Sequence, residues 1–207
     1  MDIEHASEYD ELARKYHWHG PELLFGFCFE YIQPKQKLLD LGIGTGFSSS
    51  LFFKFGLEIY GIDNSIEMLN ICESKGITKD LKRWDLLRLP LPYSDASFHC
   101  VIAAGVFHFW GDLEPIIREI SRLVVPNGIF AFTVKTIAPE KQYSGHRSKD
   151  FYSEKSSEGI PIFTHNDTYI GKLLKLSSFK KLKELKFYVF SGEGEEMLFK
   201  VFLVRKN

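Results

Sequence analysis

The chain has 207 residues, which is long enough for one domain with a full hydrophobic core. Apolar residues make up 44% of the sequence and charged residues 26%, so the composition is that of a globular protein and excludes a disordered or fibrous chain. The 26 lysines and arginines balance the 27 aspartates and glutamates, and the net charge of -1 makes a nucleic-acid-binding protein unlikely on composition.

The cysteines and the amino-terminal sequence indicate the compartment. Cys28, Cys72 and Cys100 form no CxxC pair and are odd in number, so we expect neither a disulfide framework nor a metal site. The sequence begins with an acidic stretch that lacks the apolar run of a secretion signal, and no segment approaches the ~20 apolar residues that cross a bilayer. We therefore expect a cytoplasmic protein that does not span a membrane.

From residue 37 onward, short apolar runs typical of buried strands alternate with longer amphipathic runs typical of helices. Strands are predicted over residues 37–42, 58–63, 81–85, 98–105 and 128–135. Helices are predicted over residues 46–56, 65–75 and 112–124. This alternation predicts a parallel sheet with right-handed crossovers, and the continuous apolar character of the strands predicts helices on both faces.

The remaining parts of the chain depart from this alternation. Residues 1–33 predict two helices that lie outside the alternating core. A helix at about 165–177 precedes two apolar runs separated by "GEGE", which predict an antiparallel hairpin at the edge of the sheet. Residues 136–165 form a long polar connection, and a structureless loop of this length is usually a lid, a binding loop or a mobile segment.

The stretch "LLDLGIGTGF", residues 38–47, predicts a glycine-rich turn between a strand and a helix. Such a turn offers backbone N–H groups and the positive end of a helix dipole to a ligand at the carboxyl edge of a parallel sheet. Gly42, Gly44 and Gly46 give the spacing G-x-G-x-G, which differs from the G-x-G-x-x-G of NAD-binding proteins and from a P-loop. Asp40 would repel a pyrophosphate, but its carboxylate can reach an ammonium group or orient the loop. A tight turn without a ligand is the alternative.

Two further acidic residues end the next two predicted strands. Asp63 lies roughly 20 positions after Gly42, a spacing that suits a carboxylate accepting hydrogen bonds from two vicinal ribose hydroxyls. Asp85 would accept a hydrogen bond from an exocyclic adenine amine. A solvated strand end for Asp63 and a turn or helix cap for Asp85 are the simpler alternatives.

Together, "LLDLGIGTGF", "GIDNSIEML", "WDLLRLPLPYSDASFHCVIA" and "REISRLVVPNGIFAFTV" closely resemble the class I S-adenosylmethionine-dependent methyltransferases over residues 9–135. The resemblance implies a doubly wound α/β fold of the Rossmann-like type. Its seven-stranded, mostly parallel sheet would have the order 3-2-1-4-5-7-6, with strand 7 antiparallel. The chain would be a single domain, 1–207, with an N-terminal helical cap at 1–33. His99 departs from the family pattern, in which many members carry an aspartate at this turn position.

The resemblance implies S-adenosylmethionine as the cofactor and assigns its binding residues. These are Asp40, Gly42, Gly44 and Gly46 around the methionine part, Asp63 at the ribose diol, Asn64 and Met68 beside the adenine, Asp85 and Leu86 at the adenine edge, and Ala103, Ala104 and Val106 on the side of the donor methyl.

Transfer of a methyl group to a small-molecule acceptor is the expected reaction. The sulfonium of the cofactor is already activated, so a base is needed only by an acceptor that must lose a proton. His108 and Tyr16 are the catalytic candidates. The alternative for His108, favoured by its aromatic neighbours in the sequence, is packing among Phe107, Phe109 and Trp110, and Tyr16 equally suits a packing role. An NAD-dependent oxidoreductase and a cofactor-binding module without catalysis are the alternatives.

Residues 136–165 follow the fifth strand and would form a substrate lid or loop over the mouth of the site. The candidates on the substrate side are Tyr9, His17, Tyr143 and Arg147, with His19 near them. The mixture of aromatic and basic residues in this segment would suit a small aromatic or acidic molecule. The sequence makes no prediction of the oligomeric state.

Overall fold

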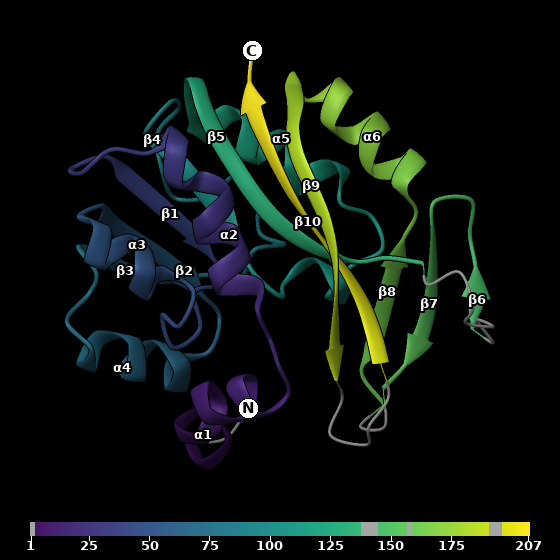
Figure 1. Cartoon of the computed structure of the whole chain (residues 1–207), viewed down its shortest axis with the longest axis horizontal. Helices are drawn as coiled ribbons and strands as arrows, with labels where there is room; N and C mark the ends of the chain where they lie inside the picture. The colour runs from purple at the N-terminus through teal and green to yellow at the C-terminus, as the bar shows by residue number, and fades with distance from the viewer. Residues whose placement is uncertain (1–2, 138–144, 157–158, 191–195) are drawn as a thin grey trace.

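A computed structural model of the chain describes residues 3–137, 145–156, 159–190 and 196–207 (Figure 1). The strands of the larger sheet are β1 (Lys37–Leu41), β2 (Glu58–Asp63), β3 (Asp80–Arg83), β4 (Phe98–Ala103), β5 (Val124–Lys135), β9 (Phe179–Phe190) and β10 (Glu196–Lys206). The helices are α1 (Ile3–Lys15), α2 (Gly20–Cys28), α3 (Ser49–Phe55), α4 (Ile66–Ser74), α5 (Glu114–Leu123) and α6 (Asp167–Leu176), with short 3-10 turns η1 (Phe29–Tyr31) and η2 (Phe107–Phe109).

The seven-stranded sheet has the order β3-β2-β1-β4-β5-β10-β9. The pairs among β1 to β5 are parallel, whereas β10 is antiparallel to both β5 and β9. Since β9 and β10 are the sixth and seventh strands of this sheet along the chain, the predicted order and the antiparallel seventh strand are confirmed. The order reverses between β1 and β4, and such a reversal opens a crevice at the carboxyl ends of the strands.

Helices cover both faces of the sheet, as the continuous apolar strands predicted (Figure 1). Side chains alternate between the faces along each strand, so Leu38 faces the layer of α2, α3 and α4 while Leu39 faces α5 and α6. Phe52 of α3 and Ile117 of α5 are almost fully buried in these two layers. Each such burial stabilises the fold by about 1.5–3 kcal/mol relative to exposure.

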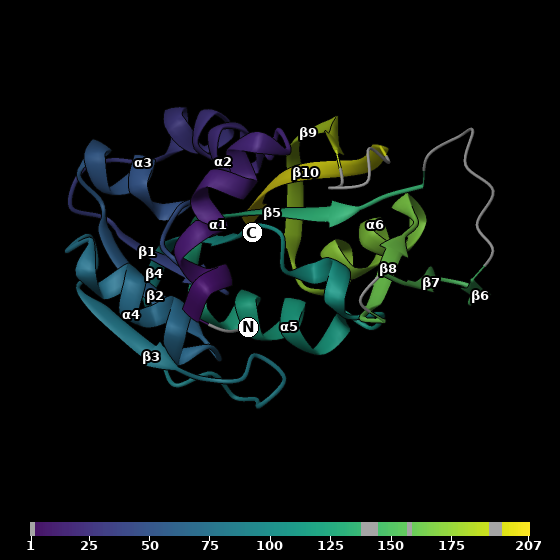
Figure 2. The ribbon, with the colours of Figure 1, turned by 90° about the horizontal axis from the view of Figure 1, so that it is seen from below.

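The two N-terminal helices have different positions. We expected both to lie outside the core, but α2 packs on β5 and β10, where Leu24 and Cys28 are fully buried. Its apolar side chains extend the layer of α3 and α4 over β5 and β10. Only α1 lies apart from these layers, beyond the carboxyl ends of the parallel strands (Figures 1 and 2).

Local signals set the ends of the helices. Gly56 has φ 105° and ends α3 in the left-handed conformation that glycine adopts without strain. The Ser65 hydroxyl accepts a hydrogen bond from the Met68 N–H (3.2 Å) and caps α4. α3 begins at Ser49 and not at residue 46, because the glycine turn continues through Gly46 before the helix forms.

The described parts of residues 136–165 contain strands that the sequence analysis missed. They form a second, antiparallel sheet of β6 (His146–Arg147), β7 (Phe151–Lys155) and β8 (Pro161–His165). β8 packs against η2, and the His165 Nε2 lies 3.1 Å from the Gly111 carbonyl oxygen. These strands carry polar and half-buried side chains, so they lack the apolar runs by which the larger sheet was predicted.

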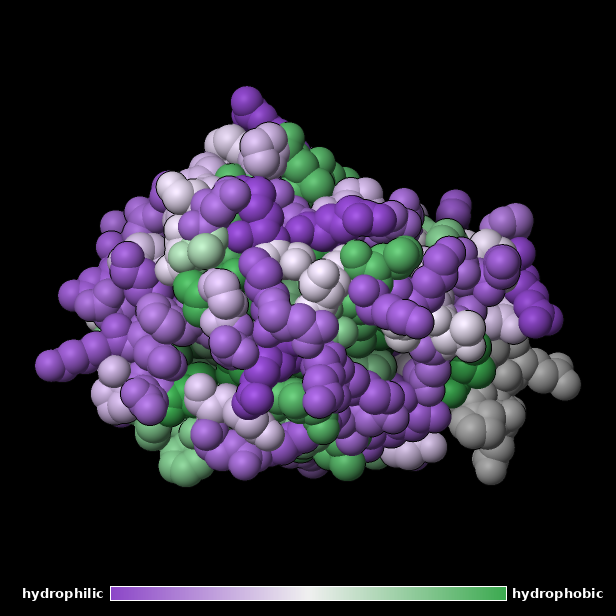
Figure 3. Space-filling model, turned by 90° about the horizontal axis from the view of Figure 1, so that it is seen from above, coloured by the Kyte–Doolittle hydropathy of each residue, from purple (hydrophilic) through white to green (hydrophobic). Residues whose placement is uncertain are grey.

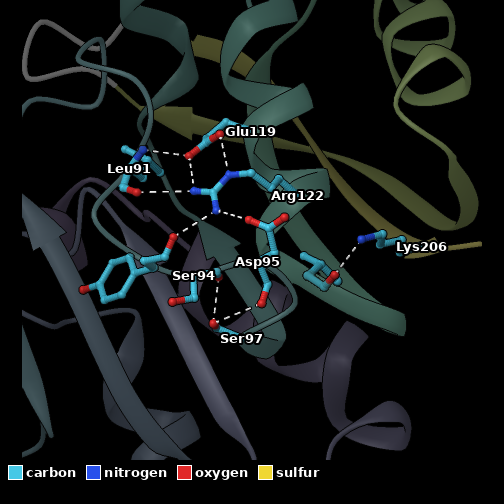
Figure 4. Close-up of polar contacts among 9 residues, drawn as sticks. Leu91, Ser94, Asp95, Ser97, Glu119, Arg122 and Lys206 are labelled. Carbon is cyan, nitrogen blue, oxygen red and sulfur yellow. Dashed lines mark hydrogen bonds and ion pairs between the residues drawn. The ribbon is translucent and has the colours of Figure 1, made fainter.

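A network around Arg122 fixes the loop between β3 and β4 (Figure 4). The Arg122 guanidinium donates to Asp95 Oδ1 (2.6 Å), to Glu119 Oε1 (2.6 Å) and to the carbonyl oxygens of Tyr93 and Leu91. The Leu91 N–H in turn donates to Glu119 Oε1 (2.7 Å). α5 thus holds the loop whose first residues follow β3 at the carboxyl edge of the sheet.

The C-terminus and the carboxyl ends of the parallel strands lie at opposite sides of the molecule (Figures 1 and 2). Seen from above, the side that carries the C-terminus is mainly hydrophilic, with hydrophobic residues visible between the polar ones (Figure 3). α1 and the carboxyl ends of the parallel strands lie at the opposite side (Figure 2). Within the described ranges, no helix is long and apolar enough to cross a membrane.

Candidate active site

A cavity of about 760 Å³ lies between the carboxyl ends of the parallel strands, α1 and the adjoining ends of β9 and β10. Its volume is within the range of about 300–1,000 Å³ that is usual for small-molecule sites. Of the predicted cofactor-binding residues, those that line it are Gly42, Gly44, Asp63, Asn64, Met68, Asp85, Leu86, Ala104 and Val106.

The three glycines of the turn all have positive φ, but they serve different purposes. A Cβ at Gly42 would lie 2.6 Å from Val106 Cγ2, and one at Gly46 would lie 2.8 Å from Cys72 Sγ, so both positions are closed by packing. A Cβ at Gly44 would meet nothing within 4 Å. Gly44 therefore leaves free space on the cavity side, where a ligand can approach the backbone.

Asp63 ends β2 and points a carboxylate into the cavity. Its Oδ2 accepts a hydrogen bond from the Gly44 N–H (3.0 Å), and its Oδ1 accepts one from the Ser65 N–H (2.9 Å). Each carboxylate oxygen has two lone pairs, so one acceptor position on each oxygen remains for a pair of ligand hydroxyls. The bonds to Gly44 and Ser65 also hold the carboxylate in one orientation.

Asp40 lies behind the glycine turn and does not line the cavity. Its side chain is 1% exposed, and its Oδ2 accepts a hydrogen bond from Ser49 Oγ (2.7 Å). Its Oδ1 is buried and has no hydrogen-bond partner among the described residues. Burial, together with the nearby charge of Asp63, raises the pKa of Asp40 to about 7, although the hydrogen bond from Ser49 acts in the opposite direction. Asp40 thus supports the turn and the start of α3 from below.

The far end of the cavity, beyond Asp63, combines polar and apolar groups. Met68 and Leu86 are buried there. Trp84, which directly follows β3 and was not among the predicted site residues, also lines this end of the cavity. The Trp84 Nε1 donates to the Arg88 carbonyl oxygen (2.8 Å). Asp85 is exposed at the mouth, and its Oδ1 accepts from the Leu87 N–H (2.9 Å), as a turn aspartate does.

Asp10 joins α1 both to the glycine turn and to the end of α4. Asp10 Oδ1 accepts a hydrogen bond from the Thr45 hydroxyl (2.5 Å), and Asp10 Oδ2 forms an ion pair with Lys75 Nζ (2.6 Å). This attachment places Tyr9 and Tyr16 over the cavity. The pKa of Tyr9 is raised by burial and by the charges of Asp10, Asp63 and Asp40.

Solved structures share this fold. A S-adenosylmethionine-dependent methyltransferase from Methanosarcina mazei aligns with a TM-score of 0.74 at 17% identity, over 87% of this chain and 96% of that one. One from Clostridium acetobutylicum aligns with a TM-score of 0.72 at 18% identity, over 98% of this chain and 97% of that one. At these identities the likeness establishes the fold.

Sequence relatives and a family model go further. A malonyl-[acyl-carrier protein] O-methyltransferase from Legionella pneumophila is 30% identical over 143 residues, 66% of this chain and 48% of the relative. A demethylmenaquinone methyltransferase from Streptomyces griseus is 32% identical over 146 residues, 67% of this chain and 59% of the relative. The chain thus spans about half the length of these relatives. A family model described as a methyltransferase domain matches residues 39–132, from β1 through β5.

Residues 39–132 match the methyltransferase domain, and the chain has the fold of the S-adenosylmethionine-dependent methyltransferases. This confirms the resemblance and the predicted cofactor, S-adenosylmethionine. The methyltransferase cavity fits S-adenosylmethionine for three reasons. Gly44 leaves open space beside the backbone, Asp63 keeps two free hydrogen-bond acceptor positions, and Met68 and Leu86 offer apolar surface to the adenine ring.

The opposite wall of the methyltransferase cavity is mostly aromatic. His108 of η2 lines it, with its ring centroid 4.1 Å from that of Phe109 and 5.5 Å from that of Phe199. Its Nδ1 is buried without a partner in the described parts of the chain. Burial, together with the charges of Lys135 and His165, lowers the pKa of His108 to about 3.

Several predicted residues lie away from the cavity. Ala103 is fully buried in β4. His17 is exposed after α1, next to His19, with its ring centroid 5.6 Å from that of Phe190. Arg147 is exposed in β6, where its guanidinium lies 5.3 Å from the Tyr152 ring. Tyr143 is outside the described residues.

Among the described residues, twelve more line the cavity, although no sequence motif marked them. They are Leu12, Ala13 and Trp18 near α1, Ser65, Trp84, Gly105, Phe109 and Trp110 in the loops, and Val189, Phe190, Met197 and Phe199 on β9 and β10. The apolar residues at the ends of β9 and β10 look like core residues in a sequence, so no pattern marked them. The described residues contain no group of three or more His, Cys, Asp or Glu side chains that could hold a metal ion.

Proposed function

We propose that this methyltransferase transfers a methyl group from S-adenosylmethionine to a small-molecule acceptor. The observation that carries the proposal is the continuity of the cavity, which Gly44 and Asp63 line at one end and Trp110 and Phe199 line at the other. A donor held at the first end and an acceptor held at the second would meet within one space, which gives the proximity that group transfer needs.

The names of two relatives support a small acceptor. One relative is named for malonyl-[acyl-carrier protein] and the other for demethylmenaquinone. Because the matched regions are about half of those proteins, we take from them the class of reaction and not the substrate. Cys28, Cys72 and Cys100 are buried free thiols, which is compatible with the cytoplasmic location that we propose.

The tasks of the chain's own residues follow from their positions. When bound, S-adenosylmethionine supplies an electrophilic methyl group, and the acceptor's lone pair takes this methyl while the electrons of the carbon–sulfur bond return to sulfur. Asp63 would accept the hydrogen bonds of a ribose diol. α1, attached by Asp10, would keep water out of the cavity and act as the cap that the N-terminal segment was expected to provide.

A general base at His108 is not part of this proposal. An imidazole whose pKa is lowered to about 3 takes up a proton poorly at neutral pH, whereas an effective base has a pKa near the working pH. We propose that the acceptor gives no proton to His108, and that an acceptor whose methylated atom carries a proton passes this proton to solvent. Tyr16 stays a candidate for contact with the acceptor, because it lines the cavity beside the aromatic wall.

Substrate choice, which we expected of residues 136–165, is better attributed to β9 and β10. These strands contribute Val189, Phe190, Met197 and Phe199 to the cavity, whereas the described residues of 136–165 contribute none to its lining. The second sheet would act indirectly, since β8 packs behind η2 and its histidine.

Turnover of methyl-labelled S-adenosylmethionine tests the proposal. The protein is incubated with a panel of small aromatic alcohols, amines and thiols, and label is measured in the acceptors. We expect transfer to at least one member and a strong loss in Phe199→Ala, with the exposed-site variant Glu73→Gln as the control. Binding of S-adenosylhomocysteine without transfer to any member would instead support a cofactor-binding module that does not catalyse.

A further inference from the structure

The two ends of the cavity differ in charge. Among the described residues that line it, the charged side chains are Asp63 and Asp85, both at the end formed by β2 and the loop after β3. We define the acceptor subsite as the opposite end, lined by Tyr16, Trp18, His108, Trp110, Phe190 and Phe199. None of these six carries a formal charge when His108 is neutral.

The aromatic rings of the acceptor subsite are held in fixed positions. The Trp18 ring packs over Gly105, where an added Cβ would lie 3.2 Å from Trp18 Cζ2. The centroids of the Trp18 and Phe199 rings are 5.2 Å apart, and the ring planes meet at 76°. The backbone N–H of Phe190 donates to the Tyr16 carbonyl oxygen (3.2 Å), which joins the end of β9 to the segment after α1. Rings fixed at steep angles to one another offer both faces and edges to a flat aromatic guest.

The surroundings of His108 keep its imidazole uncharged. Behind it, Lys135 of β5 is 4% exposed and forms an ion pair with Glu154 of β7, and His165 of β8 bonds to the Gly111 carbonyl oxygen. The Lys135 charge and burial both lower the pKa of His108. The two rings that His108 contacts, Phe109 and Phe199, are apolar.

The buried Nδ1 of His108 indicates which ring nitrogen carries the proton. Nδ1 has no hydrogen-bond partner within the described ranges. A buried N–H without a partner is rarer than a buried acceptor without one, so the proton belongs on Nε2. His108 therefore brings an N–H donor, and not a base, to the acceptor subsite.

These features select against charged acceptors. An anion or a cation in the acceptor subsite would lose its water shell without meeting a side chain of opposite charge, because none of the six lining residues is charged and Lys135, behind His108, is already paired with Glu154. We propose, resting on the proposed function, that the acceptor subsite takes a flat, uncharged aromatic molecule with an oxygen or nitrogen that accepts a hydrogen bond from His108.

Calorimetry with three probes of equal ring size tests this inference. The full chain is first titrated with S-adenosylhomocysteine, and the saturated complex is then titrated at neutral pH with 2-naphthol, 2-naphthoate or 2-naphthylmethylamine, which is an ammonium ion at this pH. We expect 2-naphthol to bind at least about tenfold more tightly than either ion, a difference of ~1.4 kcal/mol.

The outcomes are separable. Equal or tighter binding of either ion overturns the inference, as does binding of S-adenosylhomocysteine without binding of 2-naphthol. Failure to bind S-adenosylhomocysteine overturns the proposed function and the inference with it.

Two variants add independent readouts. His108→Phe keeps a ring and removes the N–H, and we expect about fivefold weaker binding of 2-naphthol with unchanged affinity for S-adenosylhomocysteine. Met197→Lys brings a cation to the wall of the cavity. We expect it to shift preference from 2-naphthol toward 2-naphthoate by about fivefold or more, which Met197→Leu, the matched control, would not do. An unchanged preference in Met197→Lys would contradict the assignment of this wall to the acceptor.

Discussion

Removal of the Asp10 carboxylate should release α1 from the methyltransferase core. Thr45 is 1% exposed and donates to Asp10, so Asp10→Ala would leave a buried hydroxyl unpaired while α1 stays docked. A hydrogen bond to a charged acceptor contributes about 1.5–3 kcal/mol. The Lys75 ion pair, with side chains 28% and 22% exposed, adds ~0.5 kcal/mol. We take about 2 kcal/mol as the contribution of Asp10 to docking of α1.

That free energy sets an upper limit on the change in cofactor affinity. About 2 kcal/mol changes the docked-to-undocked ratio of α1 roughly 30-fold. The apparent affinity for S-adenosylhomocysteine is proportional to the fraction of molecules in which α1 is docked. The dissociation constant of S-adenosylhomocysteine should therefore rise by up to about 30-fold. Tyr9, Leu12 and Tyr16 of this segment line the cavity, and undocking removes all of them from the ligand.

Calorimetric titration of Asp10→Ala and hydrogen exchange of the α1 amides measure these two effects. Glu11→Gln is the matched control, because it removes a charge from an exposed position on the same helix. Unchanged affinity together with unchanged protection of α1 in Asp10→Ala would refute the reasoning.

Three further predictions concern other parts of the structure. Arg122→Met should lower the free energy of unfolding in urea by about 2–4 kcal/mol, since it leaves the buried Glu119 without its partner. Arg118→Met, in an exposed helix pair, should cost less than ~0.5 kcal/mol, and similar losses would contradict the network. Gly42→Ala should lower the melting temperature more than Gly44→Ala, because only a Cβ at residue 42 meets Val106. Gly44→Ala should weaken cofactor binding at a stability cost of only ~1 kcal/mol. The reverse order of melting temperatures would contradict the assignment of Gly44 to the open side of the glycine turn. The pKa of Asp40 is raised from 3.8 to about 7, so the folded state retains a proton that the unfolded state loses and stability should fall as the pH rises from about 4 to 7. Asp40→Asn should flatten this dependence in urea unfolding measured at several pH values, and an unchanged slope would show that another group causes it.

The alternating strands and helices could be predicted from the sequence because their signals are local. Apolar runs such as that of β4 and the glycine turn around Gly44 depend on nearby residues alone, and Ser65 acts as the cap that its position predicts. β7 and β8 were missed because they lack a continuous apolar run: the side chains of β7 are at most half-buried, and the buried residues of β8, Thr164 and His165, are polar.

The cofactor end of the site was more predictable than the acceptor end. Asp63 and Gly44 belong to short motifs, whereas the acceptor wall is assembled from residues far apart in the chain, such as Trp18 and Phe199. Nothing in the sequence around Phe199 distinguishes a cavity wall from a core position. Likewise, the charge state of His108 depends on Lys135 and His165, which only the folded chain brings near it.

Calorimetric titration of the wild-type protein and Asp63→Ala with S-adenosylhomocysteine tests the central claim most directly. Two charge-assisted hydrogen bonds of about 1.5–3 kcal/mol each predict that affinity falls by a factor of at least ~100 in Asp63→Ala. Glu73→Gln, which removes a negative charge at an exposed site on α4, should bind like the wild type. Absence of binding by the wild type, or undiminished binding by a folded Asp63→Ala, would contradict the account.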